Sequence, residues 1–162
     1  PYVDLYLSET MSSVREAVNA CYAARNVDRY KPLWVAWTLH EIPGKGLRSG
    51  ESVENALEAV MQYEPDAFLF NCTSPAAIYS GIDLLRSITD KPIGAYPNKF
   101  NVPTGWTLDN DKPVEPREMT ESEFVAFARE CRDRGASIIG GCCGIGPSDI
   151  NAIAKGLNEQ KN

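Results

Sequence analysis

Five short apolar runs recur along the chain, and each is rich in β-branched or aromatic residues. None of them alternates strictly with polar positions, which is typical of parallel strands that are covered on both faces. The pattern therefore predicts five strands, over residues 3–7, 33–39, 67–70, 93–96 and 137–139.

Apolar positions at helical spacing follow each of these runs. Ser13 and Thr120 each stand three residues before a glutamate, which is the capping-box pattern of a helix N-terminus. Ser74 precedes a proline suited to the first helical position, and Gly135 is a natural helix end. We therefore expect helices over residues 13–22, 52–63, 74–85, 120–135 and 147–157.

A strand followed by a helix thus occurs five times, with roughly 25–45 residues from one strand to the next, which is the size of a βαβ unit. Such a chain forms either an open, doubly wound α/β sheet or part of a (β/α)₈ barrel, and a whole barrel needs about 250 residues. No G-x-G-x-x-G pattern follows the first predicted strand, which disfavours the dinucleotide-binding version of the open sheet.

Charge and hydropathy narrow the range of partners. The 162 residues include 16 basic and 22 acidic side chains, for a net charge of −6. A domain of that sign is poorly suited to a nucleic-acid backbone or an anionic membrane surface. Acidic and basic residues also interrupt every apolar run before it reaches the roughly 18–20 residues of a membrane span. We therefore expect neither nucleic acid nor a membrane as a partner.

The first residues and the cysteines bear on the cellular compartment. The chain opens with Pro1-Tyr2 and shows no basic segment ahead of an apolar stretch, so no signal peptide is visible. Because a strand is predicted almost at once, we expect a chain truncated in mid-element. Five cysteines, an odd number, indicate a reducing compartment with free or metal-bound thiols, and we expect a cytoplasmic protein.

Polar residues gather at the carboxyl ends of the predicted strands. In both candidate architectures the active site lies at that edge of the sheet. Three of the five cysteines fall there, whereas Cys21 and Cys131 lie within predicted helices and are expected to be buried thiols. The residues at this edge are Glu9, Thr10, His40, Glu41, Asn71, Cys72, Tyr96, Pro97, Asn98, Cys142 and Cys143.

The adjacent Cys142 and Cys143 form the most distinctive candidate site. Neighbouring side chains in a strand point to opposite faces, so both thiols can converge only where the backbone bends, and the glycines around them permit this. Two unrelated buried thiols or a strained vicinal disulfide are the alternatives. Cys72 can bring a third sulfur to the same edge, and three thiolates with an open fourth position would make a catalytic zinc site.

Three motifs at this edge occur together. They are Asn71-Cys72, Tyr96-Pro97-Asn98 and Gly140-Gly141-Cys142-Cys143-Gly144. In this combination the chain resembles the homocysteine S-methyltransferase family over its whole length. The resemblance implies a (β/α)₈ TIM barrel, of which residues 1–162 carry roughly repeats four to eight, with the first three repeats absent.

The resemblance also implies the roles of individual residues. Cys72, Cys142 and Cys143 are the implied zinc ligands, and no catalytic residue beyond the metal site is implied. The residues expected to bind the substrate are Glu9, as the partner of its amino group, Asn71 and Asn98.

The activity that the resemblance implies is zinc-dependent transfer of a methyl group to the homocysteine thiol, which forms methionine. The donor would be a small cationic or methyl-carrying molecule. A thiol with a pKa near 8.5 is mostly protonated at neutral pH, and binding to Zn²⁺ would present it as the nucleophilic thiolate. Two alternatives stay open: a homocysteine-binding module of a larger cobalamin-dependent methionine synthase, and an inactive zinc-binding half-barrel.

Several other residues carry expectations. His40 would close the site as a fourth ligand, so we expect it to be a polar residue at the rim. Trp106, in the long loop of residues 97–116, is a candidate for a donor pocket, because aromatic faces attract cations. Asp149 stands where many family members have histidine and is expected at the surface. The aromatic residues expected in the core are Trp34, Trp37, Phe68 and Phe70.

Five repeats of a barrel would leave the strands at residues 3–7 and 137–139 without neighbours. As a separate molecule, the chain is therefore expected to self-associate through these edges. We also expect it to lack methyl transfer, while zinc binding survives because all three candidate ligands lie within it.

Overall fold

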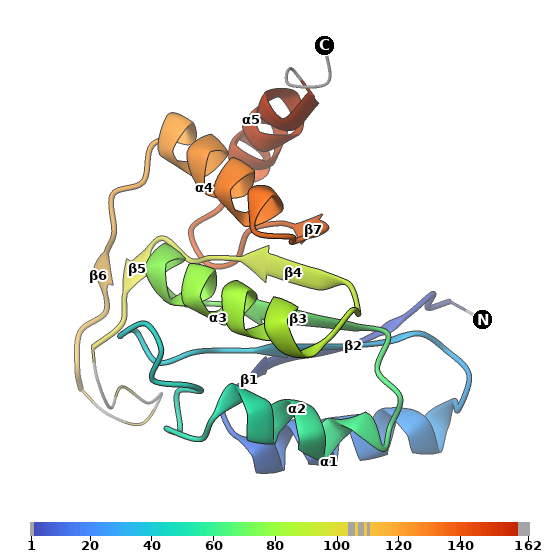
Figure 1. The fold of residues 1–162 in the computed structure, drawn as a ribbon. Helices are drawn as coiled ribbons and strands as arrows, with labels where there is room; N and C mark the ends of the chain where they lie inside the picture. The colour runs from blue at the N-terminus through green and yellow to red at the C-terminus, as the bar shows by residue number, and fades with distance from the viewer. Residues whose placement is uncertain (1, 104–105, 107–108, 110, 159–162) are drawn as a thin grey trace.

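The computed structural model of the protein describes residues 2–103, 106, 109 and 111–158. The order of strands and helices predicted from the hydrophobic pattern is confirmed (Figure 1). The elements are β1 (Tyr6–Met11), α1 (Val14–Val27), β2 (Leu33–Trp37), α2 (Val53–Met61), β3 (Ala67–Asn71), α3 (Pro75–Ile88), β4 (Ile93–Tyr96), β5 (Phe100–Asn101), β6 (Glu115–Pro116), α4 (Glu121–Asp133), β7 (Ile138–Ile139) and α5 (Pro147–Asn158).

Five of the strands form one parallel sheet in the order β1-β2-β3-β4-β7. Each strand therefore lies beside the strand of the preceding βα unit. The carboxyl ends of all five strands consequently meet at one edge of the sheet.

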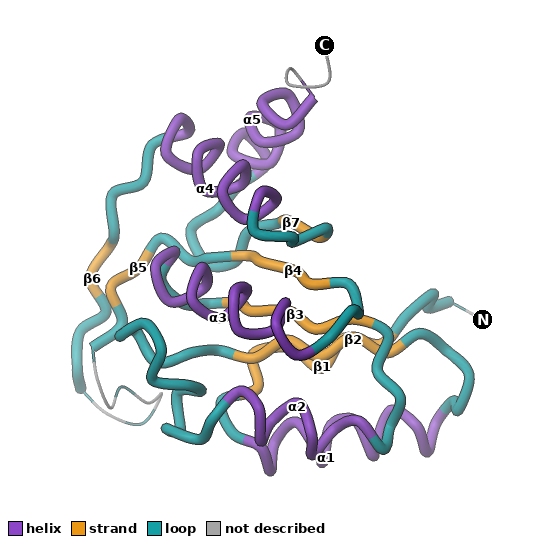
Figure 2. The backbone as a smooth tube through the Cα atoms, viewed as in Figure 1, coloured by secondary structure: helices purple, strands orange, loops and turns teal. Residues whose placement is uncertain are grey.

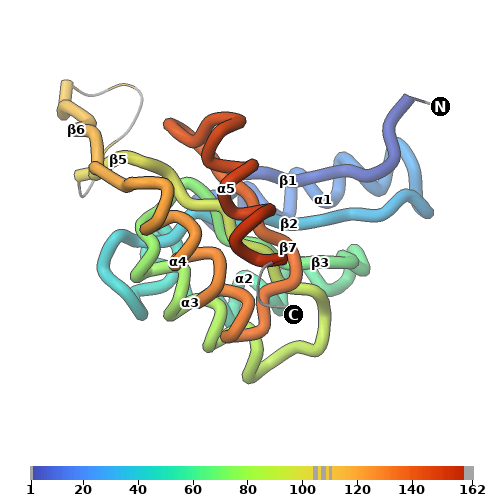
Figure 3. The backbone as a smooth tube through the Cα atoms, turned by 90° about the horizontal axis from the view of Figure 1, so that it is seen from above, coloured from blue at the N-terminus to red at the C-terminus, as the bar shows by residue number. Residues whose placement is uncertain are grey.

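The helices pack on one face of this sheet. Side chains from all five helices join a single core cluster with Leu33, Val35 and Trp37 of β2 and their neighbours on β3 and β4. Figure 3 shows α2, α3 and α4 together on one side of the strands. A doubly wound sheet would carry helices on both faces, so that alternative is wrong for the described part of the chain.

The opposite side of the sheet, here called the helix-free face, carries a smaller apolar cluster. No described helix contributes to it. Its members are Ala36, Ala67 and Leu69, with Trp34, Tyr96 and Ile138 half-buried against them.

The helices begin where the polar caps are predicted. Ser13, Ser52, Ser74 and Thr120 each accept a hydrogen bond from the backbone N–H three residues later. At Thr120 the capping box is complete. At Ser13 it is not, because the Glu16 carboxylate accepts from the backbone N–H and hydroxyl of Ser12 instead. The N-cap pattern thus locates each helix start even where the reciprocal bond differs.

Two expectations about strands are wrong. The first strand is Tyr6–Met11 and not residues 3–7, because pairing with β2 starts only at Tyr6, whose N–H donates to the Pro32 carbonyl at 2.8 Å. The long loop after β4 also contains the antiparallel pair β5–β6 (Figure 2). Strands of two residues are too short to show a hydrophobic period, so the sequence carries no signal for this hairpin.

The core confirms most of the burial expectations. Trp37, Phe68 and Phe70 are fully buried, and Trp37 stacks on Phe68 with ring centroids 5.5 Å apart. Trp34 is instead half-buried on the helix-free face. Cys21 and Cys131 are also fully buried, and burial raises the pKa of Cys21 to about 11. Neither of these two thiols is therefore suited to reaction or metal binding.

Within the described residues, every helix is too short or too polar to cross a lipid bilayer.

Candidate functional site

Three cysteine side chains converge at the carboxyl edge of the sheet. Cys72 directly follows β3, while Cys142 and Cys143 follow β7. The Sγ atoms of Cys72 and Cys143 are 4.0 Å apart and those of Cys142 and Cys143 are 3.8 Å apart. All three sulfurs lie within 4.8 Å of one another, and this is the one group of three or more potential metal ligands in the described chain.

This spacing fits a tetrahedral metal ion. Zinc with Zn–S bonds of about 2.3 Å separates its sulfur ligands by about 3.8 Å. The two measured Sγ distances of 3.8 and 4.0 Å match that value. A disulfide would need its two sulfurs about 2.05 Å apart, so Cys142 and Cys143 are not joined as a vicinal disulfide. The donor set is three sulfurs, and a fourth tetrahedral position remains for another ligand.

Glycines permit the turn that brings the two adjacent thiols to the same site. A Cβ atom at Gly141 would lie 2.1 Å from Ile145 Cγ2, so no other residue fits there without a shift of the turn. Gly144 has a φ of +81°, in the left-handed region. The turn is also bonded to the segment after β4, because Cys142 N–H donates to the Pro97 carbonyl at 2.8 Å. The bend that the sequence pattern required is present.

The third sulfur sits on an unusual backbone. Cys72 has a φ of +53°, in the left-handed region that non-glycine residues rarely adopt. Asn98, which is almost fully buried, points its amide Nδ2 at Cys72 Sγ over 3.7 Å. Asn98 therefore contacts a candidate metal ligand directly, and its predicted contact with substrate stays a prediction.

The three thiols share their protons unevenly. A hydrogen bond from the Cys142 thiol holds the pKa of Cys72 below its usual value. The same bond, followed by burial, raises the pKa of Cys142. Burial is also the main reason for the raised pKa of Cys143. Without a metal, the cluster thus favours one thiolate supported by neighbouring thiols.

Glu9 lies within β1, one residue before a second left-handed position. Thr10 has a φ of +60° and is held by Asn71, whose Oδ1 accepts from Thr10 N–H at 3.2 Å and whose Nδ2 donates to Thr10 Oγ1 at 2.7 Å. Asn71 is fully buried, and both polar atoms of its side-chain amide take part in these two bonds. It therefore connects the strand that carries Glu9 to the end of β3, directly before Cys72.

The helix-free face contributes Tyr96 to this edge. The Tyr96 hydroxyl is buried and faces the Glu9 side chain. Burial, and after it the negative charge of Glu9, raises the pKa of Tyr96. The phenol thus stays neutral and can donate a hydrogen bond to a ligand beside Glu9.

A charged cluster adjoins Cys72, and the sequence pattern places Glu41 at this edge but does not indicate its two arginine partners. Glu41 pairs with Arg48 over 3.4 Å and with Arg117 over 3.3 Å. Arg48 also donates to the carbonyl oxygen of Cys72 at 3.1 Å. Glu41 and Arg48 lie seven residues apart in the β2–α2 loop, whereas Arg117 is 76 residues from Glu41, so only the fold brings Arg117 to this pair.

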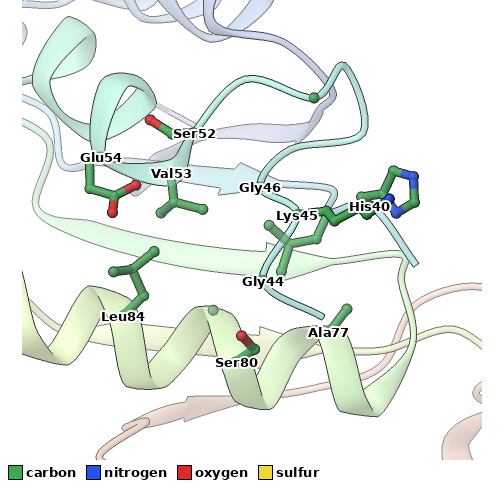
Figure 4. Close-up of a pocket in the computed structure, with 13 residues that line it drawn as sticks. His40, Gly44, Lys45, Gly46, Ser52, Val53, Glu54, Ala77, Ser80 and Leu84 are labelled. Atoms are coloured by element: carbon green, nitrogen blue, oxygen red, sulfur yellow. The ribbon is translucent and has the colours of Figure 1, made fainter. Parts of the chain in front are cut away.

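Two other predicted site residues lie apart from the sulfurs. His40 is half-buried, its Nδ1 accepts from Ile42 N–H at 3.0 Å, and it does not belong to the group of three sulfurs in the described chain. It lines a cavity of about 170 Å³ between the β2–α2 loop, α2 and α3 (Figure 4). Trp106 is half-buried, and residues 104–105 and 107–108 on either side lie outside the described part. Its role in a donor pocket stays a prediction.

The expectation for Asp149 is wrong, because this residue is buried and not at the surface. Its carboxylate accepts from Gly146 N–H at 2.9 Å and from Lys99 Nζ at 2.8 Å. These two bonds, in that order, hold the pKa of Asp149 below its usual value. Asp149 thus joins the start of α5 to the segment after β4, close to the turn that carries two of the cysteines.

Comparison with known proteins gives a consistent result along the chain. A family model described as homocysteine S-methyltransferase matches residues 1–157. Homocysteine S-methyltransferase 3 of Arabidopsis thaliana is 35% identical over 158 residues, which cover 97% of this chain and 44% of that protein. Selenocysteine methyltransferase of Astragalus bisulcatus is 30% identical over 159 residues, covering 96% and 45%. The chain spans about half the length of these curated relatives.

The fold is similar to solved structures of the homocysteine methyltransferase MmuM from Escherichia coli. For the apo form the TM-score is 0.73 with 20% identity, covering 96% of this chain and 50% of that chain. For the metallated form the TM-score is 0.72 with 21% identity, covering 95% and 45%. At this level of identity the likeness concerns the fold, an α/β architecture with a parallel sheet.

Proposed function

The chain belongs to the homocysteine S-methyltransferase family, and from that premise we propose that the protein transfers a methyl group to the thiol of homocysteine and forms methionine. One observation carries the proposal. Three cysteine sulfurs at the carboxyl edge of the sheet lie at the spacing of a tetrahedral zinc site with one position left for a substrate sulfur.

The three thiolates would hold Zn²⁺, and their chemistry suits this role. Soft sulfur ligands favour zinc over magnesium or calcium, and a site with three protein ligands keeps an open position, as catalytic zinc sites do. When bound, the metal would hold the sulfur of the substrate as a thiolate at neutral pH. Cys143 is exposed, so the cluster can be reached from solvent.

Other residues of the chain orient the substrate. The carboxylate of Glu9 binds the substrate ammonium group, and Asn71 holds the adjacent Thr10 so that the carboxylate stays in place. The buried hydroxyl of Tyr96, beside Glu9, donates a hydrogen bond to the same substrate. Asn98 supports the Cys72 sulfur and lies at the edge of the substrate site. Positioning of this kind contributes much of the acceleration in a displacement at a methyl carbon.

The donor side of the site is assigned to the loop after β4. Trp106 would offer an aromatic face to a cationic methyl donor. A cleft of about 550 Å³ between Glu41 and this loop, with Arg117 and Pro103 in its wall, is large enough for a small donor molecule.

The sheet is proposed to form repeats four to eight of a (β/α)₈ barrel. Helices on one face, strands in sequential order and an apolar helix-free face all support this arrangement. The cytoplasm is the proposed compartment. All five cysteines are free thiols, which a reducing environment preserves.

Metal analysis and homocysteine binding test the proposal. Protein purified under reducing conditions is expected to hold about one zinc per chain, which Cys72→Ser and Cys142→Ala lose. The matched control is Cys131→Ala, which removes a buried thiol remote from the cluster and leaves zinc content unchanged. Calorimetry should show homocysteine binding to the zinc-loaded protein only. Zinc retained in both site variants, or homocysteine binding independent of zinc, would overturn the assignment.

Methionine formation identifies the donor. In the enzyme with all eight repeats, S-methylmethionine, S-adenosylmethionine, betaine and a methylated cobalamin or folate are to be compared. Methionine is expected with at least one of them and is lost in Cys72→Ser. No methionine with any donor would leave a zinc-binding module and contradict the transferase.

A further inference from the structure

Cys72 is held through its backbone as well as through its sulfur. Its N–H donates to the Tyr96 carbonyl at 3.2 Å. Its carbonyl oxygen accepts from Thr38 Oγ1 at 3.2 Å and from Arg48 Nη2 at 3.1 Å. A left-handed non-glycine residue costs about 1–3 kcal/mol and persists only where its surroundings impose it. These bonds are therefore the restraint that keeps Cys72 in its conformation.

Arg48 is itself fixed at both ends. Its backbone N–H donates to the Thr38 carbonyl at 3.0 Å, and its guanidinium pairs with Glu41 Oε1 over 3.4 Å. Glu41 accepts from Thr73 Oγ1 at 3.3 Å and pairs with Arg117 over 3.3 Å. The Arg48, Glu41 and Arg117 side chains are between 20 and 23% exposed. A guanidinium with this many partners has little freedom to leave the Cys72 carbonyl.

The same network continues to the segment that carries Cys142 and Cys143. Arg117 N–H donates to the Lys99 carbonyl at 2.8 Å, and Arg117 Nε donates to Asn101 Oδ1 at 3.1 Å. Lys99 N–H in turn donates to the Cys143 carbonyl at 2.9 Å. A continuous series of bonds therefore runs from the carbonyl of Cys72 to the carbonyl of Cys143. It joins the two separate segments that carry the sulfurs.

We propose that Arg48 is a positioning residue for the metal site, which fixes the Cys72 carbonyl and, through Glu41 and Arg117, sets the spacing of Cys72 from Cys143. The inference rests on the zinc site of the proposed function and adds a residue outside the sulfur ligands to it. Electrostatics favours the same role. Three thiolates carry one negative charge more than Zn²⁺ neutralises, and a partly buried guanidinium bonded to a ligand residue offsets that excess.

A purely structural role for Arg48 predicts a different result. If the guanidinium only stabilises the β2–α2 loop, its removal lowers the free energy of unfolding. Metal affinity then falls by no more than that loss of stability explains. If it positions a ligand, metal affinity and ligand geometry change beyond the loss of stability. Loss of partners that orient metal ligands typically costs about 10- to 100-fold in metal affinity.

The chain offers a matched control for this comparison. Arg25 is similarly part-buried and donates to three backbone carbonyls, those of Tyr63, Lys31 and Glu64. These carbonyls precede β2 and β3 at the opposite edge of the sheet, away from the sulfurs. Arg25→Met therefore removes the same kind of side chain, with three carbonyl bonds against the one that Arg48 makes to Cys72, without touching the site.

The experiment compares the wild type with Arg48→Met, Arg48→Lys, Thr38→Val and Arg25→Met. Three quantities are measured for each protein. They are the Kd for zinc, by competition with a chelator, the sulfur-to-metal absorption bands after loading with Co²⁺, and the free energy of unfolding of the metal-free protein. Arg48→Met is expected to raise the Kd about 10- to 100-fold and to shift the Co²⁺ bands. Arg48→Lys keeps the charge and should fall between it and the wild type. Thr38→Val, which removes the other bond to the Cys72 carbonyl, should weaken zinc in the same direction.

Arg25→Met is expected to lower stability while zinc affinity and the Co²⁺ bands stay at wild-type values. Wild-type zinc affinity in Arg48→Met, or a loss in Arg25→Met as large as in Arg48→Met, overturns the inference and leaves the proposed function standing. If Arg48→Met does not fold, Arg48→Lys and Thr38→Val decide by the same comparison. A wild type that binds no zinc overturns the proposed function together with this inference.

Discussion

At the scale of single residues, two of the three described non-glycine residues with positive φ lie at the candidate site, and the third, Glu64, is in the turn before β3. Thr10 and Cys72 both have positive φ values, and both are held by bonds from side chains of other strands or loops. Asn71 stands between them in the fold, bonded to one and adjacent in sequence to the other. Such conformations are retained where the surrounding structure imposes them, and they cluster at functional sites. The position of Glu9 therefore depends on Asn71 as much as on β1.

Replacing Glu9 by glutamine tests its role toward the substrate. A hydrogen bond to a charged group is worth about 1.5–3 kcal/mol, so in the enzyme with all eight repeats Glu9→Gln should raise the KM for homocysteine about tenfold or more. Zinc content should not change, since Glu9 is not one of the grouped ligands. Glu58→Gln, an exposed carboxylate on α2, serves as the control with unchanged kinetics. Unaltered homocysteine kinetics in Glu9→Gln would assign the carboxylate a structural role.

Asp149 predicts a pH dependence of stability. Its pKa is lowered in the folded protein by Gly146 N–H and by Lys99. Its contribution is therefore complete above the unfolded value of about 3.9 and is lost as the pH falls through the lower folded value. Asp149→Asn keeps an acceptor for Gly146 and loses the ion pair. It should lower the free energy of unfolding by about 1–2 kcal/mol at pH 7.

Chemical denaturation at several pH values measures this difference. The difference in free energy of unfolding between the wild type and Asp149→Asn should disappear as the pH falls below about 4. Asp133→Asn, which alters an exposed carboxylate, is the matched control with little effect at any pH. A gap that stays constant down to pH 2 would show that the ion pair with Lys99 does not stabilise the fold.

At the scale of elements, the turn between β7 and α5 decides whether the cysteines converge. Gly141 and Gly140 are adjacent, yet only Gly141 is closely packed. A Cβ at Gly141 would lie 2.1 Å from Ile145, whereas one at Gly140 would meet Tyr96 Cβ at an ordinary 3.5 Å. Gly141→Ala should therefore cost about 1–3 kcal/mol of stability and weaken zinc binding. Gly140→Ala should do neither. Equal effects of the two substitutions on zinc affinity would contradict this description of the turn.

The helices and most of the strands could be predicted from the sequence, for physical reasons that particular elements show. Helix starts such as Ser74 and Thr120 carry their signal within four residues, since an N-cap bonds locally. The start of β1 at Tyr6 depends on pairing with β2, which is distant in sequence. The hairpin β5–β6 depends on tertiary contacts alone.

In the candidate site, too, features with a sequence signal could be predicted and features that depend on tertiary contacts could not. The three cysteines could be found because strand ends meet at one edge of a parallel sheet and their motif is distinctive. The link from Arg48 through Glu41 to Arg117 could not, because it joins the β2–α2 loop to a segment 76 positions from Glu41 that shares no period with it. The burial of Asp149 was missed for a similar reason, since its partner Lys99 lies 50 positions away.

At the scale of the whole molecule, the sheet is covered on one face and open at two edges. β1 and β7 are its outer strands, and Leu7 of β1 is 39% exposed beside the helix-free face. An unpaired strand edge next to an apolar surface promotes association.

The 162-residue chain as a separate molecule is therefore expected to self-associate. Light scattering and sedimentation should show species larger than a monomer that increase with concentration. Leu7→Lys places a charge on the edge strand and should reduce this association. A stable monomer at all concentrations would show that the open edges do not promote association and that the five strands form a sheet that is stable by itself.

X-ray absorption at the zinc edge tests the central claim, that three sulfurs of this chain hold zinc and leave one position for homocysteine. The account predicts three sulfur ligands at about 2.3 Å and one lighter atom in the protein alone, and four sulfur ligands after homocysteine is added. A coordination shell that does not change with homocysteine, or one with fewer than three sulfurs at the start, would contradict it.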